Sequence, residues 1–219
     1  MAEPSDERDD AKKKPRKKHL TLIRSFSLAD LITLSNGSAG MGAVLLSMAY
    51  VGSADRSLMW GALGLLPLAL VFDFADGWVA RWRRRSSPFG AALDSLADVV
   101  SFGVAPAAIG FALGLDGLLD AFVLIYFVGC GISRLARFNV TADDLMTEEG
   151  KVSHFEGTPI PTSVLIVVAL AIAFGTNAVH DAMWLGSVEV ATLTLHPLVL
   201  VYFVSGTAMV SATLKVPKP

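Results

Sequence analysis

The sequence predicts an all-α integral membrane protein with six transmembrane helices and both termini in the cytoplasm. Three observations lead to this fold class. The 219 residues are 53% hydrophobic and 17% charged, with a mean hydropathy of +0.55, whereas an average soluble domain is about 25% charged. Six apolar stretches are long enough to cross a bilayer, and Lys and Arg are distributed one-sidedly between them. This composition argues against a water-soluble globule, a disordered chain and a nucleic-acid-binding protein.

The N-terminal segment, residues 1–19, is acidic and then basic, and it carries too few apolar side chains to bury a core. We therefore expect a disordered cytoplasmic tail, followed by a six-helix transmembrane domain over residues 20–215. Residues 20–27 are compatible with a short interfacial helix that leads into the first span.

Each of the six apolar stretches has about 20 residues or more, which is enough for a helix to cross a hydrocarbon core of about 30 Å. Helices are favoured because backbone polar groups must be satisfied inside the lipid. The expected spans are residues 28–50, 57–80, 89–113, 118–138, 160–179 and 190–213.

The distribution of positive charge predicts the orientation. Seventeen of the 18 Lys and Arg residues lie near the N-terminus, between spans 2 and 3, between spans 4 and 5, or at the C-terminus. Only Arg56 falls on the other side. Because positive residues concentrate on the cytoplasmic side, both termini should be cytoplasmic. The loops on the far side are instead acidic, with Asp55, Asp116, Asp120, Asp181 and Glu189.

Four carboxylates lie within spans 2 and 3: Asp73, Asp76, Asp94 and Asp98. A charged side chain in a span costs at least a few kcal/mol, so such residues usually face a partner or a wet cavity. No lysine in either span could pair with them. Spacings of three and four residues place each pair on one helix face. The basic turn over residues 83–88 joins the two helices, so the four acids should meet near the cytoplasmic end of a helical hairpin.

Four converging carboxylates would repel one another unless cations lay between them, and hard oxygen ligands favour Mg²⁺ or Mn²⁺. Gly77 and Ala80 remove bulk from the same face, so that a ligand can approach the backbone. Helix capping, or pairing with Arg81, would explain a single aspartate better than a set of four. For Gly90, close helix packing explains the glycine as well as ligand contact does.

The pattern D-x2-D-G-x2-A-R-x8-G-x3-D-x3-D resembles the signature of the CDP-alcohol phosphatidyltransferases. That resemblance implies the fold of this family, and transfer of a phosphatidyl group from a CDP-linked lipid to an alcohol with release of CMP. The pattern is matched in full by Asp73, Asp76, Gly77, Ala80, Arg81, Gly90, Asp94 and Asp98.

Other segments are similar to one branch of that family, the membrane-embedded phosphatidylserine synthases. They are LITLSNG in the first span, DSLADVVSFGVAPA (94–107), SRLARFN (133–139) and FEGTPIP (155–161). The resemblance implies an enzyme that joins L-serine to the phosphatidyl group of CDP-diacylglycerol, or of an ether-lipid equivalent. It also implies a homodimer in the cell membrane, with the active site near the cytoplasmic face.

The same resemblance implies roles for individual residues. The four aspartates would bind two divalent ions, Mg²⁺ or Mn²⁺, and Asp98 would also accept the proton of the serine hydroxyl. The CDP-lipid would contact Thr33, Asn36, Gly77, Ala80, Arg81 and Ser87. The serine side would include Arg134, Arg137, Asn139, Phe155, Gly157 and Pro159. Positive-inside anchoring is an alternative explanation for the two arginines of this last group.

Two alternatives remain open at the level of sequence. The acceptor could be glycerol 3-phosphate or inositol phosphate, but these substrates carry a phosphate and would need a further basic pocket. From another class, a divalent-cation transporter could use intramembrane aspartates as a conduction site. Against it, all four acids lie near one membrane face, and no acidic residues continue to the other side.

Overall fold

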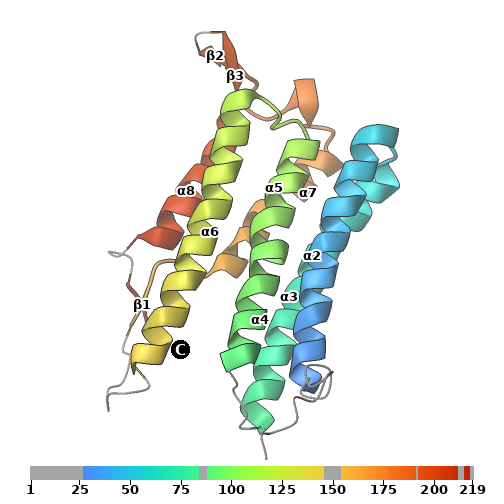
Figure 1. Ribbon diagram of the computed structural model, residues 1–219. Helices are drawn as coiled ribbons and strands as arrows, with labels where there is room; N and C mark the ends of the chain where they lie inside the picture. The colour runs from blue at the N-terminus through green and yellow to red at the C-terminus, as the bar shows by residue number, and fades with distance from the viewer. Residues whose placement is uncertain (1–26, 84–87, 146–153, 191, 212–214, 218–219) are drawn as a thin grey trace, which may run out of the picture.

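The computed structural model describes residues 27–83, 88–145, 154–190, 192–211 and 215–217. Long helices run side by side along one axis, and short strands lie at the two ends of the bundle (Figure 1). The predicted tail (1–19) and interfacial segment (20–27) lie outside the described residues except for Ser27. The boundary between tail and membrane domain therefore stays a prediction.

Four helices are long and apolar enough to cross a membrane among the residues described, and they match the first four predicted spans. They are α2 (Leu28–Ser53), α3 (Arg56–Arg83), the continuous α4 (Pro88–Asp98), η1 (Val99–Val104) and α5 (Ala105–Ala112), and α6 (Leu118–Leu145). The chain is thus a mostly helical, multi-pass membrane protein.

The last two predicted spans are shorter than expected. The prediction for 160–179 was wrong at its end, because the helix formed by η2 (Ile160–Ser163) and α7 (Val164–Gly175) stops at Gly175. Asn177 then adopts a left-handed backbone with φ 57°, which does not continue a right-handed helix. The short η3 (His180–Ala182) follows.

The prediction of a helix from residue 190 was also wrong. Strands β2 (Val188–Val190) and β3 (Leu193–Leu195) form an antiparallel hairpin that pairs Val190 with Leu193. The β-branched residues of VEVATLTL favour strands over helix, and Thr192 turns the chain with φ 78°. Helical structure resumes only at η4 (Pro197–Val199) and continues as α8 (Leu200–Val210).

The first helix begins at a capping box and ends at a tight turn. The Ser27 hydroxyl accepts a hydrogen bond from the amide of Asp30, whose carboxylate accepts one from the amide of Ser27, and this satisfies two free donors of the helix end. After Ala54, the Asp55 carboxylate accepts a hydrogen bond of 2.9 Å from the Ser57 amide. This bond to Ser57 lowers the pKa of Asp55, so this loop aspartate is negatively charged at neutral pH.

Close packing of small residues holds the bundle together. Helix α2 packs against α3 and against the α4–η1–α5 helix. A Cβ at Gly37 would lie 3.4 Å from the Cα of Ala97, and one at Gly40 would lie 2.5 Å from the Cα of Ser101. Glycines at such positions let helix backbones approach closely. Large apolar side chains such as Ile125 (68% exposed) point outward, as expected for a surface in contact with lipid.

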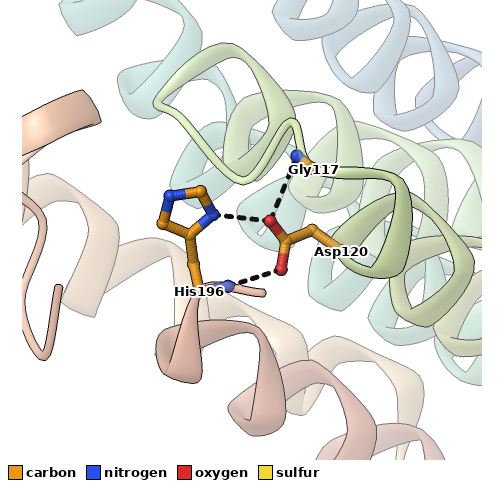
Figure 2. A network of polar contacts seen from close by, with 3 residues as sticks. All are labelled: Gly117, Asp120 and His196. Atoms are coloured by element: carbon orange, nitrogen blue, oxygen red, sulfur yellow. Dashed lines mark hydrogen bonds and ion pairs between the residues drawn. The ribbon is translucent and has the colours of Figure 1, made fainter. Parts of the chain in front are cut away.

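The end of the bundle that carries the β2–β3 hairpin is fastened by buried polar contacts. Asp120 was predicted in an acidic loop on the far side, but it lies in the first turn of α6 and is 0% exposed. Figure 2 shows that its carboxylate accepts hydrogen bonds from the Gly117 amide (3.1 Å) and the His196 amide (2.9 Å), and contacts His196 Nδ1 at 2.6 Å. These contacts fasten the start of α6 to the segment that precedes α8.

Arg56, which the charge pattern separated from all other positive residues, also has a structural role at this end. Its guanidinium donates hydrogen bonds of 2.8 Å to the carbonyl of Phe174 and to Asn177 Oδ1. It also lies 4.1 Å from the centre of the Phe174 ring. The start of α3 is thereby joined to the end of α7, where a positive charge complements the helix dipole.

Candidate active site

Three of the four predicted acids come together, two from α3 and one from α4. One carboxylate oxygen from each of Asp73, Asp76 and Asp94 lies within 4.8 Å of the others. This meeting point lies at the end of the bundle opposite the β2–β3 hairpin (Figure 1). The convergence predicted from the residue spacing is confirmed for these three residues.

Asp98 lies one turn further along the same helix and is 7% exposed. Its Oδ1 accepts a hydrogen bond of 3.1 Å from the Asn36 side chain. It is close enough to Asp73 and Asp94 for their negative charges to act on it. The fourth acid therefore lies beside the cluster and is held by a neighbouring helix.

Helix α2 supports two of the acids through residues that the resemblance assigned to the nucleotide. The Thr33 hydroxyl donates a hydrogen bond of 2.6 Å to Asp76 Oδ2, and Asn36 donates to Asp98. Both α2 side chains are almost fully buried. They lie at the acids, and their contacts to carboxylates are a feature that the sequence did not reveal. Their contact with the CDP-lipid stays a prediction.

The cluster fits a divalent cation. Asp94 Oδ1 is buried and has no hydrogen-bond partner among the described residues, although buried polar atoms are normally paired. Carboxylate oxygens that converge from two helices are the donor set that Mg²⁺ or Mn²⁺ prefers. Asp73, Asp76 and Asp94 can share a cation, with Asp98 beside them.

The third membrane-spanning helix changes its geometry directly after Asp98. Residues Val99–Val104 form a π-helical turn, in which the Ala105 amide bonds to the carbonyl of Val100, five residues back. The residue pattern alone did not predict this turn, although Pro106 was a usable signal. Proline has no N–H, so it cannot provide the α-helical partner of the Phe102 carbonyl. Such turns occur frequently at functional sites.

The residues predicted for the serine side are placed unevenly. Arg134 is half-buried on α6, near enough to Asp98 for their charges to interact. Its Nε is buried without a hydrogen-bond partner in the described part of the chain. Arg137 is exposed. Asn139 is bonded to Ser95 of α4, with its side-chain amide 3.0 Å from the Ser95 hydroxyl.

The FEGTPIP segment is anchored by the end of the chain. Strand β1 (His154–Glu156) pairs with β4 (Lys215–Pro217), and the pairing aligns Phe155 with Val216. Gly157 is buried with φ 77°, and a Cβ there would collide with the carbonyl oxygen of Met209. The Thr158 amide donates to the carbonyl of Ala208, whereas Pro159 is exposed.

Several predicted contacts cannot be placed. Arg81 and Ala80 belong to α3, but their side chains lie outside the described residues, as do Ser87 entirely and the side chain of Phe155. Gly77 is half-buried and follows Asp76 directly. The assignment of these residues to substrates stays a prediction.

An acidic cluster that could hold a divalent metal, within a bundle of membrane-spanning helices, defines a class of multi-pass membrane proteins. Comparison with known families makes the class specific. The family model described as CDP-alcohol phosphatidyltransferase matches residues 26–210. The chain therefore belongs to the CDP-alcohol phosphatidyltransferase family, as its signature predicted, and it is an enzyme of that divalent-metal-dependent family.

Curated relatives narrow the comparison. The chain is 42% identical over 204 residues to the CDP-diacylglycerol--serine O-phosphatidyltransferase of Saccharomyces cerevisiae. The aligned region covers 92% of this chain and 74% of the relative. It is 41% identical over 149 residues to the archaetidylserine synthase of Methanothermobacter thermautotrophicus (66% of this chain, 58% of the relative). It is 37% identical over 145 residues to the CDP-diacylglycerol--serine O-phosphatidyltransferase of Helicobacter pylori (65% and 56%).

Proposed function

We propose that this protein transfers the phosphatidyl group of CDP-diacylglycerol, or of an ether-lipid equivalent, to L-serine. The products are phosphatidylserine, or its ether analogue, and CMP. The observation that carries the proposal is the acidic cluster on α3 and α4, in a chain 42% identical to a relative named for this reaction. The names of these relatives share serine but differ in the lipid, so the proposal covers both ester-linked and ether-linked lipid tails.

The reaction exchanges one bond for another at phosphorus. The serine hydroxyl oxygen bonds to the phosphorus of the phosphatidyl group, the pyrophosphate P–O bond breaks, and CMP leaves with the bonding electron pair. The hydroxyl proton must go to a base, because a neutral hydroxyl is a weak nucleophile. Asp98 is the proposed acceptor of that proton, and Asn36 fixes its carboxylate through the 3.1 Å hydrogen bond.

Divalent cations would be held by Asp73, Asp76, Asp94 and Asp98. When bound, they would neutralise the pyrophosphate oxygens and the charge that develops on the leaving CMP. Thr33 would keep Asp76 oriented toward the site through its 2.6 Å hydrogen bond. Arg81, together with Gly77, Ala80 and Ser87, would contact the CDP moiety.

The acceptor would be recognised from α6 and from the loop before α7. The buried Nε of Arg134 has no hydrogen-bond partner among the described residues, and Arg134 lies near Asp98. Its guanidinium could therefore bind the serine carboxylate in a bidentate manner. Arg137, Asn139, Phe155, Gly157 and Pro159 complete the proposed serine side. The contact between Asn139 and Ser95 supports a role for this asparagine in joining α6 to α4.

We also propose six spans, with the active site near the cytoplasmic face of the cell membrane and two copies in a homodimer. The helices Ile160–Gly175 and Pro197–Val210 are apolar but shorter than 18 residues. A helix of 16 residues is about 24 Å long, so a locally thinned bilayer or flanking polar side chains must accommodate it. The one-sided Lys and Arg distribution supports cytoplasmic termini.

An acceptor panel tests the function. Purified protein is given radiolabelled CDP-diacylglycerol with Mg²⁺ or Mn²⁺ and with L-serine, glycerol 3-phosphate or inositol phosphate, and CMP is measured. We expect CMP release that depends on serine. Release that is independent of serine, or that occurs only with a phosphorylated acceptor, would contradict the proposed acceptor. Metal flux into liposomes without CMP release would favour a transporter.

A further inference from the structure

The π-helical turn after Asp98 carries Ser101, whose buried hydroxyl contacts α2, the helix that also provides the hydrogen bond to Asp98. Ser101 lies within the turn and is 0% exposed. Its hydroxyl donates a hydrogen bond of 2.9 Å to the backbone carbonyl of Asn36. The Asn36 side chain in turn donates to Asp98. Two contacts between the same pair of helices therefore meet at one residue of α2.

A glycine makes the first of these contacts possible. In an α-helix the carbonyl of residue 36 already faces the amide of residue 40, so a second donor must approach beside residue 40. A Cβ at Gly40 would lie 2.5 Å from both the Cα and the hydroxyl oxygen of Ser101. Because the carbonyl oxygen has two lone pairs, Ser101 can use the second one only where residue 40 has no side chain.

We propose that Ser101, admitted by Gly40, is a positioning residue for the transfer reaction. Its hydrogen bond fixes the Asn36 backbone, and Asn36 then fixes the carboxylate of Asp98. Ser101 touches neither substrate in this proposal and acts only through Asn36. The inference rests on the proposed function, since it assigns Ser101 a role in presenting the proton acceptor.

Asp98 and Ser101 can both face α2 because they are three residues apart. Asp98 must face Asn36 while Ser101, three residues later, faces the backbone of the same helix. The π-helical turn begins at Val99, directly after Asp98, and contains Ser101. Asp98 (7% exposed) and Ser101 are both directed into the contact with α2.

The main test is Ser101→Ala, which removes the hydroxyl and keeps the Cβ. We expect kcat for serine-dependent CMP release to fall about tenfold, equivalent to about 1.4 kcal/mol of activation free energy. The KM values for serine and CDP-diacylglycerol should stay near those of the wild type, because no substrate contact is lost. Gly40→Ala should lower kcat similarly, because its new Cβ would force Ser101 away.

Ser47→Ala is the matched control. Ser47 is also on α2 and is 1% exposed, but its hydroxyl bonds to the Ala43 carbonyl within its own helix. Equal falls in kcat and melting temperature for Ser47→Ala and Ser101→Ala would show a general packing effect and overturn the proposal.

A double-mutant cycle provides the decisive measurement. If Ser101 acts through Asn36, then Ser101→Ala should cause little further loss of kcat in an Asn36→Ala background, because interacting residues are non-additive. Fully additive losses would overturn the inference. A wild-type protein that releases no CMP with serine would instead refute the proposed function and the inference that rests on it.

Discussion

Replacing Asp98 with asparagine separates the chemistry of the cluster from its stability. The change keeps the shape of the side chain and its acceptor oxygen, so the hydrogen bond from Asn36 can persist. It removes one negative charge from a group of four acids that repel one another. We therefore expect no loss of thermal stability. Without the carboxylate there is no proton acceptor, and general-base catalysis typically contributes about 10²–10⁴-fold, so kcat should fall by a factor in that range.

The matched control is the same substitution at the opposite end of the bundle. Asp120 is 0% exposed and has three contacts, with the Gly117 amide, the His196 amide and the His196 ring. An asparagine offers one carbonyl oxygen, and its NH₂ group cannot accept a hydrogen bond. At least one donor is left unpaired, and an unsatisfied buried donor costs about 1–3 kcal/mol. Asp120→Asn should lower the unfolding free energy while kcat of the folded fraction stays unchanged.

The assay measures both quantities on the same preparations. Serine-dependent CMP release gives kcat per folded protein, and thermal unfolding in detergent gives stability. Asp98→Asn should lose activity without a lower melting temperature, and Asp120→Asn should show the reverse. An Asp98→Asn protein that retains most of the wild-type kcat would refute the assignment of Asp98 as the proton acceptor.

Three further outcomes are expected. Exhaustive chelation should abolish CMP release and added Mg²⁺ or Mn²⁺ should restore it; full turnover after chelation would contradict the metal site. Thr33→Val removes the hydrogen bond to Asp76. It should raise the metal concentration needed for half-maximal activity about tenfold, as loss of other groups that orient metal ligands does. Ser38→Ala, at an exposed position of the same helix, is the control. Gly157→Ala should raise the KM for serine. Gly186→Ala, also at positive φ but in open space, should leave it unchanged. Equal KM values for the two variants would argue against a role of the FEGTPIP segment in binding serine.

The acidic cluster shows how far residue spacing alone can lead. Asp73 and Asp76 share a helix face because they are three residues apart, and only a short basic segment of sequence separates their helix from the one that carries Asp94. Such relations are local, so the meeting with Asp94 was predictable. The contacts of Thr33 and Asn36 join residues 43 and 62 positions apart, and no local pattern specifies which side chains meet across two helices.

By itself, the sequence determined the membrane-spanning helices up to residue 140, the family, and the meeting of three acids, because hydropathy and helical periodicity act over a few turns. Tertiary structure decided the rest. It replaced the start of the last predicted span with the β2–β3 hairpin, buried Asp120 against His196, and joined the hydroxyl of Ser101 to the backbone of α2. These features depend on how closely two backbones can approach, which only the packing of the whole bundle sets.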